Sequence, residues 1–356
     1  MARAPGGEFR LIRAFTRALP GRGEGVRVGV GDDAAVLAPP RGEDLVATVD
    51  AVIEGVHLDA GASPFDWGWK ALAVNLSDLA AMGARPLWAL VALCVPREER
   101  AGRILGVVRG VAACARRHGI AVVGGNVSRA TALSLCITAV GAVRRGRFLT
   151  RAGARPGDVL LGSGTFGDAA LGIEEGAGPS LARRQRRPVP RLSLGRALAG
   201  IAHAAIDVSD GLAQDLAHLA EASGVSAVLE VPRVPTSPAY RRRTAGRPDP
   251  LAAALSGGED YELLLAVPPG RLGAALSAGR RASTPLAVLG RFERGRGLRL
   301  VGPDGRLRRA PAGHDHLRAP GPVLTSPSRR LGSGPVAGAR ARPAKVRGTF
   351  DAKPKR

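Results

Sequence analysis

The sequence predicts an α/β fold, with partly segregated α+β elements, built from two domains. At 356 residues the chain is longer than one hydrophobic core usually organises. Strand-like and helix-like runs alternate as far as Arg151, and a new series starts at Gly157. We therefore expect domains over residues 1–150 and 151–317. The Pro-, Gly-, Ser- and Arg-rich residues 318–356 lack apolar periodicity and predict a disordered basic tail.

In the first domain, apolar spacing predicts an early helix over Glu8–Leu19 and glycines predict a mobile loop over Gly21–Gly25. A longer helix should begin with Asp66 as its cap and end at Gly83. A third helix is expected over Arg97–His118. The five strands of this domain are expected over Ala34–Leu37, Leu45–Val49, Leu87–Val95, Ile120–Val123 and Leu133–Val140.

In the second domain, five apolar runs predict strands and one amphipathic run predicts a helix from Leu212 to Gly224. The basic segment Arg183–Arg187 is expected to be exposed. Gly162–Gly167 has the spacing of a dinucleotide fingerprint, but no acid lies between Gly176 and Ile206 to bind a ribose, which disfavours that function. The expected strands are Val159–Leu161, Ala204–Ile206, Ala227–Val231, Glu262–Val267 and Leu286–Phe292.

The chain is strongly basic, with 52 Lys and Arg against 30 Asp and Glu, a net charge of +22. From Arg318 onward, ten basic residues face one acid, a net of +9 in 39 residues. This charge leaves open a protein that binds RNA or DNA through its tail. However, the few aromatic residues do not alternate with the basic ones, as a stacking surface for single strands requires.

Several features indicate a protein of the reducing cytoplasm with no membrane partner. Cys94, Cys114 and Cys136 are widely spaced among apolar residues and predict core packing. The first thirty residues contain no apolar stretch typical of a secretory signal. The longest apolar run, Leu87–Val95, is too short to cross a bilayer.

Carboxylates recur where strands and helices end. Asp33 follows Asp32 ahead of an apolar run, and Asp50 ends a strand. Asp78 lies in a mostly apolar helix, and Asp207 and Asp210 follow a later strand. One such pair alone is typical of a solvated turn. Their repetition instead predicts a site for hard metal ions, which prefer acidic oxygen ligands.

Two glycine pairs, Gly124-Gly125 and Gly257-Gly258, accompany these acids. Glycines let backbone N–H groups approach phosphate oxygens, and Mg²⁺ neutralises transferring phosphoryl groups. The chain has no P-loop motif, no Gly-x-Ser-x-Gly and no zinc-ligand pattern. Together these observations predict an ATP-using enzyme without a P-loop.

Seven motifs follow one another along the chain: Gly31–Ala35, Thr48–Asp50 with Glu54–His57, Gly68–Asp78, Ala81–Ala84, Val123–Asn126, Asp207–Leu212 and Gly257–Tyr261. Between about Gly7 and Leu317 the chain resembles the thiamine-monophosphate kinase family. The Gly-Asp-Asp and Ser-Asp-Gly pieces are shared with the wider aminoimidazole-ribonucleotide-synthetase-like superfamily. The Glu-Gly-Val-His and Gly-Trp-Lys-Ala runs are more specific to the kinases.

The resemblance implies the two-domain aminoimidazole-ribonucleotide-synthetase-like fold and a homodimer built on strands of the first domain. It implies direct in-line transfer of the ATP γ-phosphoryl group to thiamine monophosphate, giving thiamine diphosphate and ADP. The acceptor is already an anionic phosphate, so no strong general base is needed. By resemblance, several Mg²⁺ ions are bound by Asp33, Thr48, Asp50, Asp78, Asn126, Asp207 and Asp210, ATP by Gly125, Asn126, Arg151 and Ser209, and thiamine monophosphate by His57 and Glu259.

The chain departs from the family pattern at three places. Asn126 stands where many relatives have Asp, which removes one ligand charge, and Val49 replaces a frequent Thr. The C-terminal Gly-aromatic-Asp-His-Phe pattern appears as Gly313-His314-Asp315-His316-Leu317, without either aromatic residue.

Two alternatives to this kinase remain open. One is another ATP-dependent synthetase of the same superfamily, of the purine-ligase or selenophosphate type. The selenophosphate type expects a reactive Cys near the N-terminus, and none precedes Cys94. The other is a basic nucleic-acid-binding protein, whose salt-dependent binding would be abolished by removing the tail.

Overall fold

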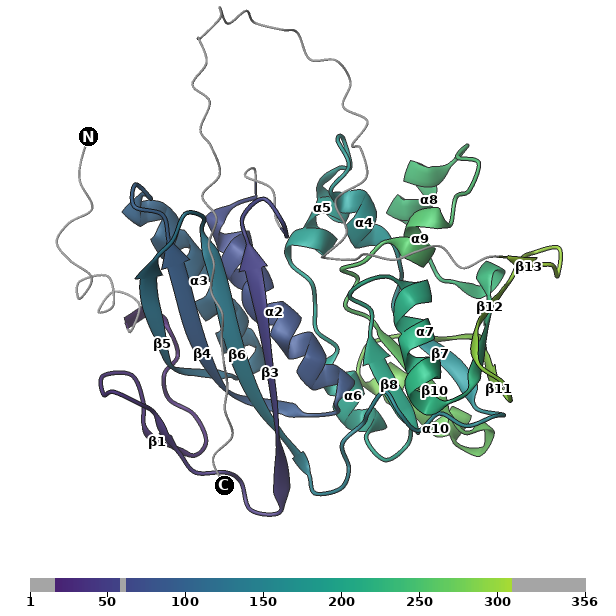
Figure 1. Cartoon of the computed structure of the whole chain (residues 1–356), viewed down its shortest axis with the longest axis horizontal. Helices are drawn as coiled ribbons and strands as arrows, with labels where there is room; N and C mark the ends of the chain where they lie inside the picture. The colour runs from purple at the N-terminus through teal and green to yellow at the C-terminus, as the bar shows by residue number, and fades with distance from the viewer. Residues whose placement is uncertain (1–16, 58–61, 309–356) are drawn as a thin grey trace, which may run out of the picture. The chain divides into compact units, whose positions relative to one another are not determined.

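The computed structural model describes residues 17–57 and 62–308. The N-terminal half of this region holds a small two-stranded sheet, a four-stranded sheet and two long helices (Figure 1). Their bounds are β1 Val26–Val28, β2 Val36–Leu37, β3 Glu43–Ile53, α2 Pro64–Ala81, β4 Arg85–Val95, α3 Ala101–His118, β5 Ala121–Arg129 and β6 Ser134–Arg144.

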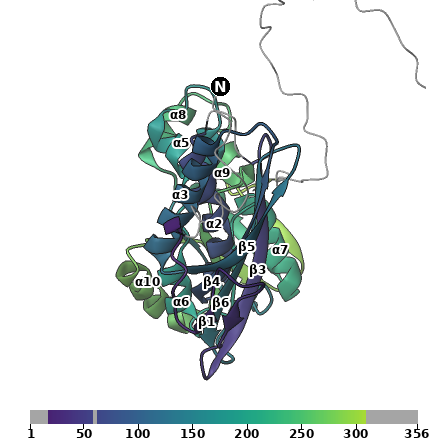
Figure 2. The ribbon, with the colours of Figure 1, turned by 90° about the vertical axis from the view of Figure 1, so that its left-hand side faces the viewer.

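The four-stranded sheet has the order β3-β6-β4-β5, antiparallel except for the β4–β5 pair. Helices α2 and α3 pack on one of its faces (Figure 1 and Figure 2), and their apolar residues join the strands in one hydrophobic core. On the other face, Val49 of β3 is 59% exposed and Leu90 of β4 is 43% exposed. The register aligns both of them with Thr138 of β6. We refer to this surface as the open face.

The C-terminal half is built on a seven-stranded sheet of order β13-β12-β9-β11-β7-β10-β8. One hydrophobic cluster joins the sheet to α7, and a second joins it to α6 and α10. The sheet is therefore covered on both faces, as its apolar strands predict. Its elements are β7 Val159–Ser163, α4 Asp168–Gly172, α5 Pro179–Arg186, α6 Leu192–Leu198, β8 Ala204–Asp207, α7 Leu212–Ser223, β9 Ser226–Glu230, α8 Pro238–Thr244, α9 Ala252–Ser256, β10 Leu263–Val267, α10 Leu272–Arg281, β11 Leu286–Glu293, β12 Gly297–Val301 and β13 Leu307–Arg308.

Helix α2 is the element that both halves share. Fourteen of its eighteen residues are buried, and it packs against α3, β3 and β6 on one side and against α6 and β8 on the other (Figure 1). The contact with α6 is close, since a Cβ atom at Gly195 would lie 1.9 Å from the carbonyl oxygen of Ala80. A helix buried in this way must satisfy each of its polar side chains internally.

The structure confirms the predicted strands and the three helices that lie in the described region, and it corrects several details. Ser63, not Asp66, caps α2, because the Ser63 hydroxyl accepts the Asp66 N–H at 3.2 Å. Strand β5 continues through Gly124-Gly125-Asn126 instead of ending before them. Strand β12 follows the strand expected to close the fold.

The basic segment Arg183–Arg187 differs most from its prediction. It forms the second half of helix α5 and the residue after it, and Arg184 and Arg187 are ion-paired to buried carboxylates instead of being fully exposed. Most of the predicted helix Glu8–Leu19 and the whole tail 318–356 lie outside the described residues. Across residues 17–57 and 62–308, no helix has both the length and the apolar character that a membrane crossing needs.

Gly68 of α2 and Gly110 of α3 lie where the two helices cross, and neither has room for a side chain. A Cβ atom would lie 1.8 Å from the Val107 carbonyl oxygen at Gly68, and 2.0 Å from that of Phe65 at Gly110. Because the helices must separate, we expect Gly110→Ala to lower the free energy of unfolding by about 1–3 kcal/mol in urea denaturation. Gly102→Ala is the control, since a Cβ atom there meets nothing within 4 Å. Equal destabilisation by both variants would contradict this packing.

Candidate functional site

A partly buried carboxylate, Asp78, and a buried one, Asp207, meet where α2 packs against both sheets. Asp78 of α2 accepts the Thr48 hydroxyl of β3 at 2.5 Å, and Asp207 at the end of β8 accepts the Ser77 hydroxyl at 2.7 Å. Burial raises the pKa of Asp78, and burial together with the Asp78 charge raises the pKa of Asp207 to about 7. The two acids therefore lie close enough to repel each other in a poorly solvated site.

Tyr261 marks where the acids converge. It is 9% exposed and packs in the core of the N-terminal half, although it belongs to the C-terminal half. Its pKa is raised by burial first and then by four carboxylates, those of Glu259, Asp207, Asp50 and Asp78. The structure thus brings together acids that are far apart in sequence, since Asp50 and Glu259 are separated by 209 positions.

Two further contacts complete this cluster. The fully buried Asn75 of α2 accepts the backbone N–H of Asp50 at 3.1 Å, which holds β3 beside the helix. Contrary to the sequence prediction, Asp50 does not end its strand, because β3 continues to Ile53. Arg151, in the connection between the halves, lowers the pKa values of both Asp78 and Asp207 and so lies near them. It is exposed, so its charge is accessible to an anionic ligand.

The loop after β8 is organised by Asp215. One carboxylate oxygen of Asp215 accepts the backbone N–H groups of Ser209, Asp210 and Gly211 at 3.0, 3.0 and 3.1 Å. Burial nevertheless raises the pKa of Asp215 to about 7. The loop that follows Asp207 is therefore held as one unit at the start of α7.

A second turn, residues 257–262, pairs with this loop through its backbone. Glu259 N–H donates to the Ser209 carbonyl and Tyr261 N–H donates to the Val208 carbonyl, both at 2.8 Å. Gly258 is required here because a Cβ atom would lie 2.2 Å from the Ser209 carbonyl oxygen. The two loops consequently cannot move independently.

This turn is strained. Glu259 and Tyr261 have positive φ angles of 67° and 51°, which side-chain-bearing residues rarely adopt. Such conformations cost of order 1–3 kcal/mol each and persist only where the surroundings impose them. Here the strained turn directs the Glu259 side chain toward Lys70 of the N-terminal half, and it buries Tyr261 in the core of that half.

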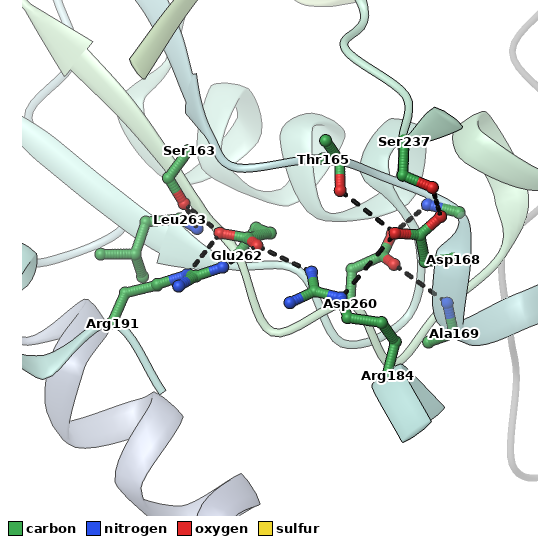
Figure 3. Close-up of polar contacts among 11 residues, drawn as sticks. Ser163, Thr165, Asp168, Ala169, Arg184, Arg191, Ser237, Asp260, Glu262 and Leu263 are labelled. Atoms are coloured by element: carbon green, nitrogen blue, oxygen red, sulfur yellow. Dashed lines mark hydrogen bonds and ion pairs between the residues drawn. The ribbon is translucent and has the colours of Figure 1, made fainter. Parts of the chain in front are cut away.

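A buried ionic network holds the far end of the turn (Figure 3). Glu262 is fully buried and accepts Arg184 at 2.9 Å, Arg191, and the Ser163 hydroxyl at 2.6 Å. Asp260 accepts the Gly167 N–H at 2.7 Å at the start of α4, and burial raises its pKa to about 8. Buried charges of this kind require partners, so α5 and the residues before α6 are tied to the turn.

On the other side, the turn is tied to α2. Lys70 is fully buried, and its ammonium group donates to Glu259 at 2.5 Å and to the His57 carbonyl at 2.9 Å. Gln185 of α5 donates to the same two residues, at 3.1 Å and 3.2 Å. Burial lowers the pKa of Lys70, and the Glu259 charge opposes that shift.

A separate apolar cavity of about 130 Å³ lies between α3 and the four-stranded sheet. Gly124, Gly125 and Asn126 form part of its wall. Gly125 has no room for a side chain, since a Cβ atom would lie 2.0 Å from the Val91 carbonyl oxygen. The other lining residues are Leu19, Val30, Val91, Leu93, Val107, Val108, Val111, Val122, Val127 and Leu135.

The predicted site residues fall into three groups, with Asp33 apart from all of them. Thr48, Asp50, Asp78, Arg151, Asp207 and Glu259 converge around Tyr261, and His57 joins them through Lys70 and Gln185. Ser209 and Asp210 lie in the adjoining loop, and Gly125 and Asn126 lie at the cavity. Asp33 is exposed between β1 and β2, where its N–H donates to Asp32.

Sequence reasoning did not single out Lys70, Gln185, Arg184 or Asp215 as site residues. Lys70 is one of only four Lys residues in an Arg-rich chain, and it interrupts an apolar helix, which is a usable signal. Asp215 lies in the first turn of a helix after three N–H groups that need an acceptor. Arg184 and Gln185 offered no such signal, because their partners lie 78 and 74 residues away.

The residues present fit Mg²⁺. Asp78 and Asp207 are oxygen donors whose mutual repulsion a divalent cation would relieve. Within the described part of the chain, no three acidic, His or Cys side chains form a complete metal cage. That arrangement suits Mg²⁺, which takes one or two carboxylates together with waters and substrate phosphates.

Comparison with known proteins agrees with this architecture. Residues 31–143 match the N-terminal domain of AIR synthase related proteins, and residues 155–302 match the C-terminal domain. The thiamine-monophosphate kinase of Salmonella typhimurium is 38% identical over 326 residues, covering 88% of this chain and 99% of that protein. The Haemophilus influenzae kinase is 38% identical over 272 residues, covering 74% and 82%.

Solved structures give the same result. The thiamine-monophosphate kinase of Stenotrophomonas maltophilia K279a superposes with a TM-score of 0.75 at 40% identity, covering 86% of this chain and 99% of that one. AaThiL complexed with AMPPCP and TMP gives 0.70 at 31% identity, covering 89% and 99%. The hydrogenase maturation protein HypE of E. coli, at 21% identity, shares only the fold. This chain belongs to the thiamine-monophosphate kinase family of AIR synthase related proteins.

Proposed function

We propose that this protein transfers the γ-phosphoryl group of ATP to thiamine monophosphate, giving thiamine diphosphate and ADP. The observation that carries the proposal is the convergence of Asp50, Asp78 and Asp207 beside Glu259 around Tyr261. A relative of the same fold has been solved with AMPPCP and TMP, the two ligands that such a reaction needs.

In this proposal more than one Mg²⁺ ion would bind here, sharing Asp50, Asp78 and Asp207 as ligands with at most two carboxylates to an ion, and Thr48 is oriented toward Asp78. The family pattern adds Asp33, Asn126 and Asp210. When bound, Mg²⁺ would neutralise charge on the phosphate oxygens. Asn75 and Ser77 hold Asp50 and Asp207 in place through the contacts described above.

ATP occupies the side of the site that faces α3 and β5. The apolar cavity receives the adenine ring, because its walls are aliphatic and Gly125 keeps the backbone close. Ser209 contacts the phosphates from the loop that Asp215 holds, and the exposed Arg151 contacts them from the connection between the halves. These residues bind and orient the nucleotide.

Thiamine monophosphate lies on the side of Glu259 and His57. Glu259 faces the N-terminal half on a strained turn and offers a negative charge to the cationic thiazolium and amine donors of the substrate. Its acceptor phosphate is an anionic nucleophile, so the chain has only to align donor and acceptor in line. Residue positioning and electrostatics supply the catalysis, with no general base.

The protein acts as a homodimer in the cytoplasm, with the open face of the four-stranded sheet as the interface. The exposed Val49 and Leu90 form a row across the centre of that face with Thr138. Contiguous apolar surface of this kind is typical of an interface between proteins.

The first prediction concerns the reaction itself. We expect ADP release from Mg-ATP with thiamine monophosphate, and not with thiamine or aminoimidazole precursors. Asp207→Asn should lower kcat at least about 100-fold, because it removes a charged oxygen where phosphoryl charge develops. Asp304→Asn, an exposed acid on the C-terminal half, is the matched control and should retain full activity. ATP binding without ADP release would refute the substrate assignment.

The second prediction concerns the dimer. Leu90→Arg places a charge at the centre of the open face and should convert the dimer to a monomer of 36.6 kDa in light scattering. Leu307→Arg changes an equally apolar residue, 68% exposed on β13, and should leave the dimer intact. A Leu90→Arg variant that keeps the mass of wild type would exclude this interface.

A further inference from the structure

Two donors from different halves of the chain bridge the same two acceptors. Lys70 of α2 donates to Glu259 Oε1 and to the His57 carbonyl, at 2.5 Å and 2.9 Å. Gln185 of α5 donates to Glu259 Oε2 and to the same carbonyl, at 3.1 Å and 3.2 Å. Both oxygens of Glu259 are thereby held, and the carboxylate cannot rotate freely. We call Lys70 and Gln185 the clamp.

The clamp is buried, whereas Glu259 reaches solvent. Lys70 is 0% and Gln185 4% exposed, while the Glu259 side chain is 27% exposed. A buried ammonium is costly unless it is paired, and bonds to charged groups are among the stronger ones. The protein nevertheless buries the Lys70 ammonium beside a single carboxylate that reaches solvent, and that carboxylate lies on a turn whose backbone is strained.

Helix α5 connects the clamp to the ionic network behind the turn. Neighbouring residues of this helix hold opposite ends of the turn, since Arg184 binds Glu262 and Gln185 binds Glu259. In Figure 3, Arg184 lies between Glu262 and the pair Asp168 and Asp260. The helix therefore sets where the turn lies relative to α2.

We propose that Lys70 and Gln185 are positioning residues that determine how Glu259 and His57 recognise the substrate. This rests on the proposed function. With both oxygens held from the protein side, the carboxylate presents its remaining lone pairs in one direction, toward the amine donor of a cationic heterocycle. The shared His57 carbonyl fixes the distance between the two recognition residues. The clamp thus governs the affinity for thiamine monophosphate and leaves the ATP side unaffected.

Steady-state kinetics test the clamp on the complete protein. Lys70→Met keeps an unbranched side chain one atom shorter but removes its charge, and Gln185→Leu removes the amide. Each should raise KM for thiamine monophosphate about tenfold, the loss of one charge-assisted bond. KM for ATP should stay within about twofold. Thr244→Val, a buried change in α8 that removes a bond to the Tyr240 carbonyl, controls for general destabilisation and should change neither KM.

A double-mutant cycle shows whether Lys70 acts through Glu259. In a Glu259→Gln background, Lys70→Met should raise KM by less than about threefold, because the partner it orients has already changed. If the rise in KM of the double variant equals the product of the rises in the two single variants, the proposal is wrong. Variants that lower thermal stability while leaving KM for thiamine monophosphate unchanged would also overturn it.

Hydrogen–deuterium exchange tests the clamp without any substrate. Lys70→Met and Gln185→Leu should each accelerate exchange in peptides covering residues 53–57 and 257–262, whereas Thr244→Val should not. Unchanged exchange in both peptides would refute the clamp even if the enzyme phosphorylates thiamine monophosphate. If exchange is faster in these variants but the wild-type protein does not phosphorylate thiamine monophosphate, the clamp is supported and the proposed function is refuted.

Discussion

The burial of helix α2 is the constraint on which the rest of the structure depends. It packs against both sheets, so its polar side chains cannot reach bulk water and must find partners on other elements. Lys70 binds Glu259, Asn75 binds the Asp50 backbone, and Ser77 binds Asp207. Each partner lies in a different segment of the site: the turn over residues 257–262, strand β3 and the end of strand β8. Satisfying one helix therefore assembles the candidate active site.

The turn over residues 257–262 carries this constraint into the C-terminal half. Its backbone pairs with the loop after Asp207, and its side chains reach α2, α4 and α5. Glu259, which is proposed to bind the substrate, and the loop proposed to bind metal and ATP are thus held together through backbone hydrogen bonds. For a reaction that depends on alignment, such positioning is itself the catalytic contribution.

The electrostatics follow the same logic. Asp207 is buried and Asp78 beside it is partly buried, and the repulsion between their charges is one that a divalent cation would relieve. Glu262 and Asp260 are more deeply buried than Asp78, but Arg184 and Arg191 compensate the Glu262 charge and backbone N–H groups bind Asp260. The same residue type therefore serves binding in one place and scaffolding in another, according to whether the protein supplies the counter-charge.

The sequence by itself determined the fold class and most strands, and it singled out the acids of the candidate site, because hydrophobic periodicity and short motifs are local signals. Asp50, Asp78 and Asp207 stood out at the ends of strands or inside an apolar helix, and the structure places them together. Only the tertiary structure decided that the basic segment around Arg184 is scaffolding and that Lys70 and Gln185 hold Glu259. Those contacts join residues 74 to 189 positions apart, and no local pattern encodes which buried charge will meet which partner.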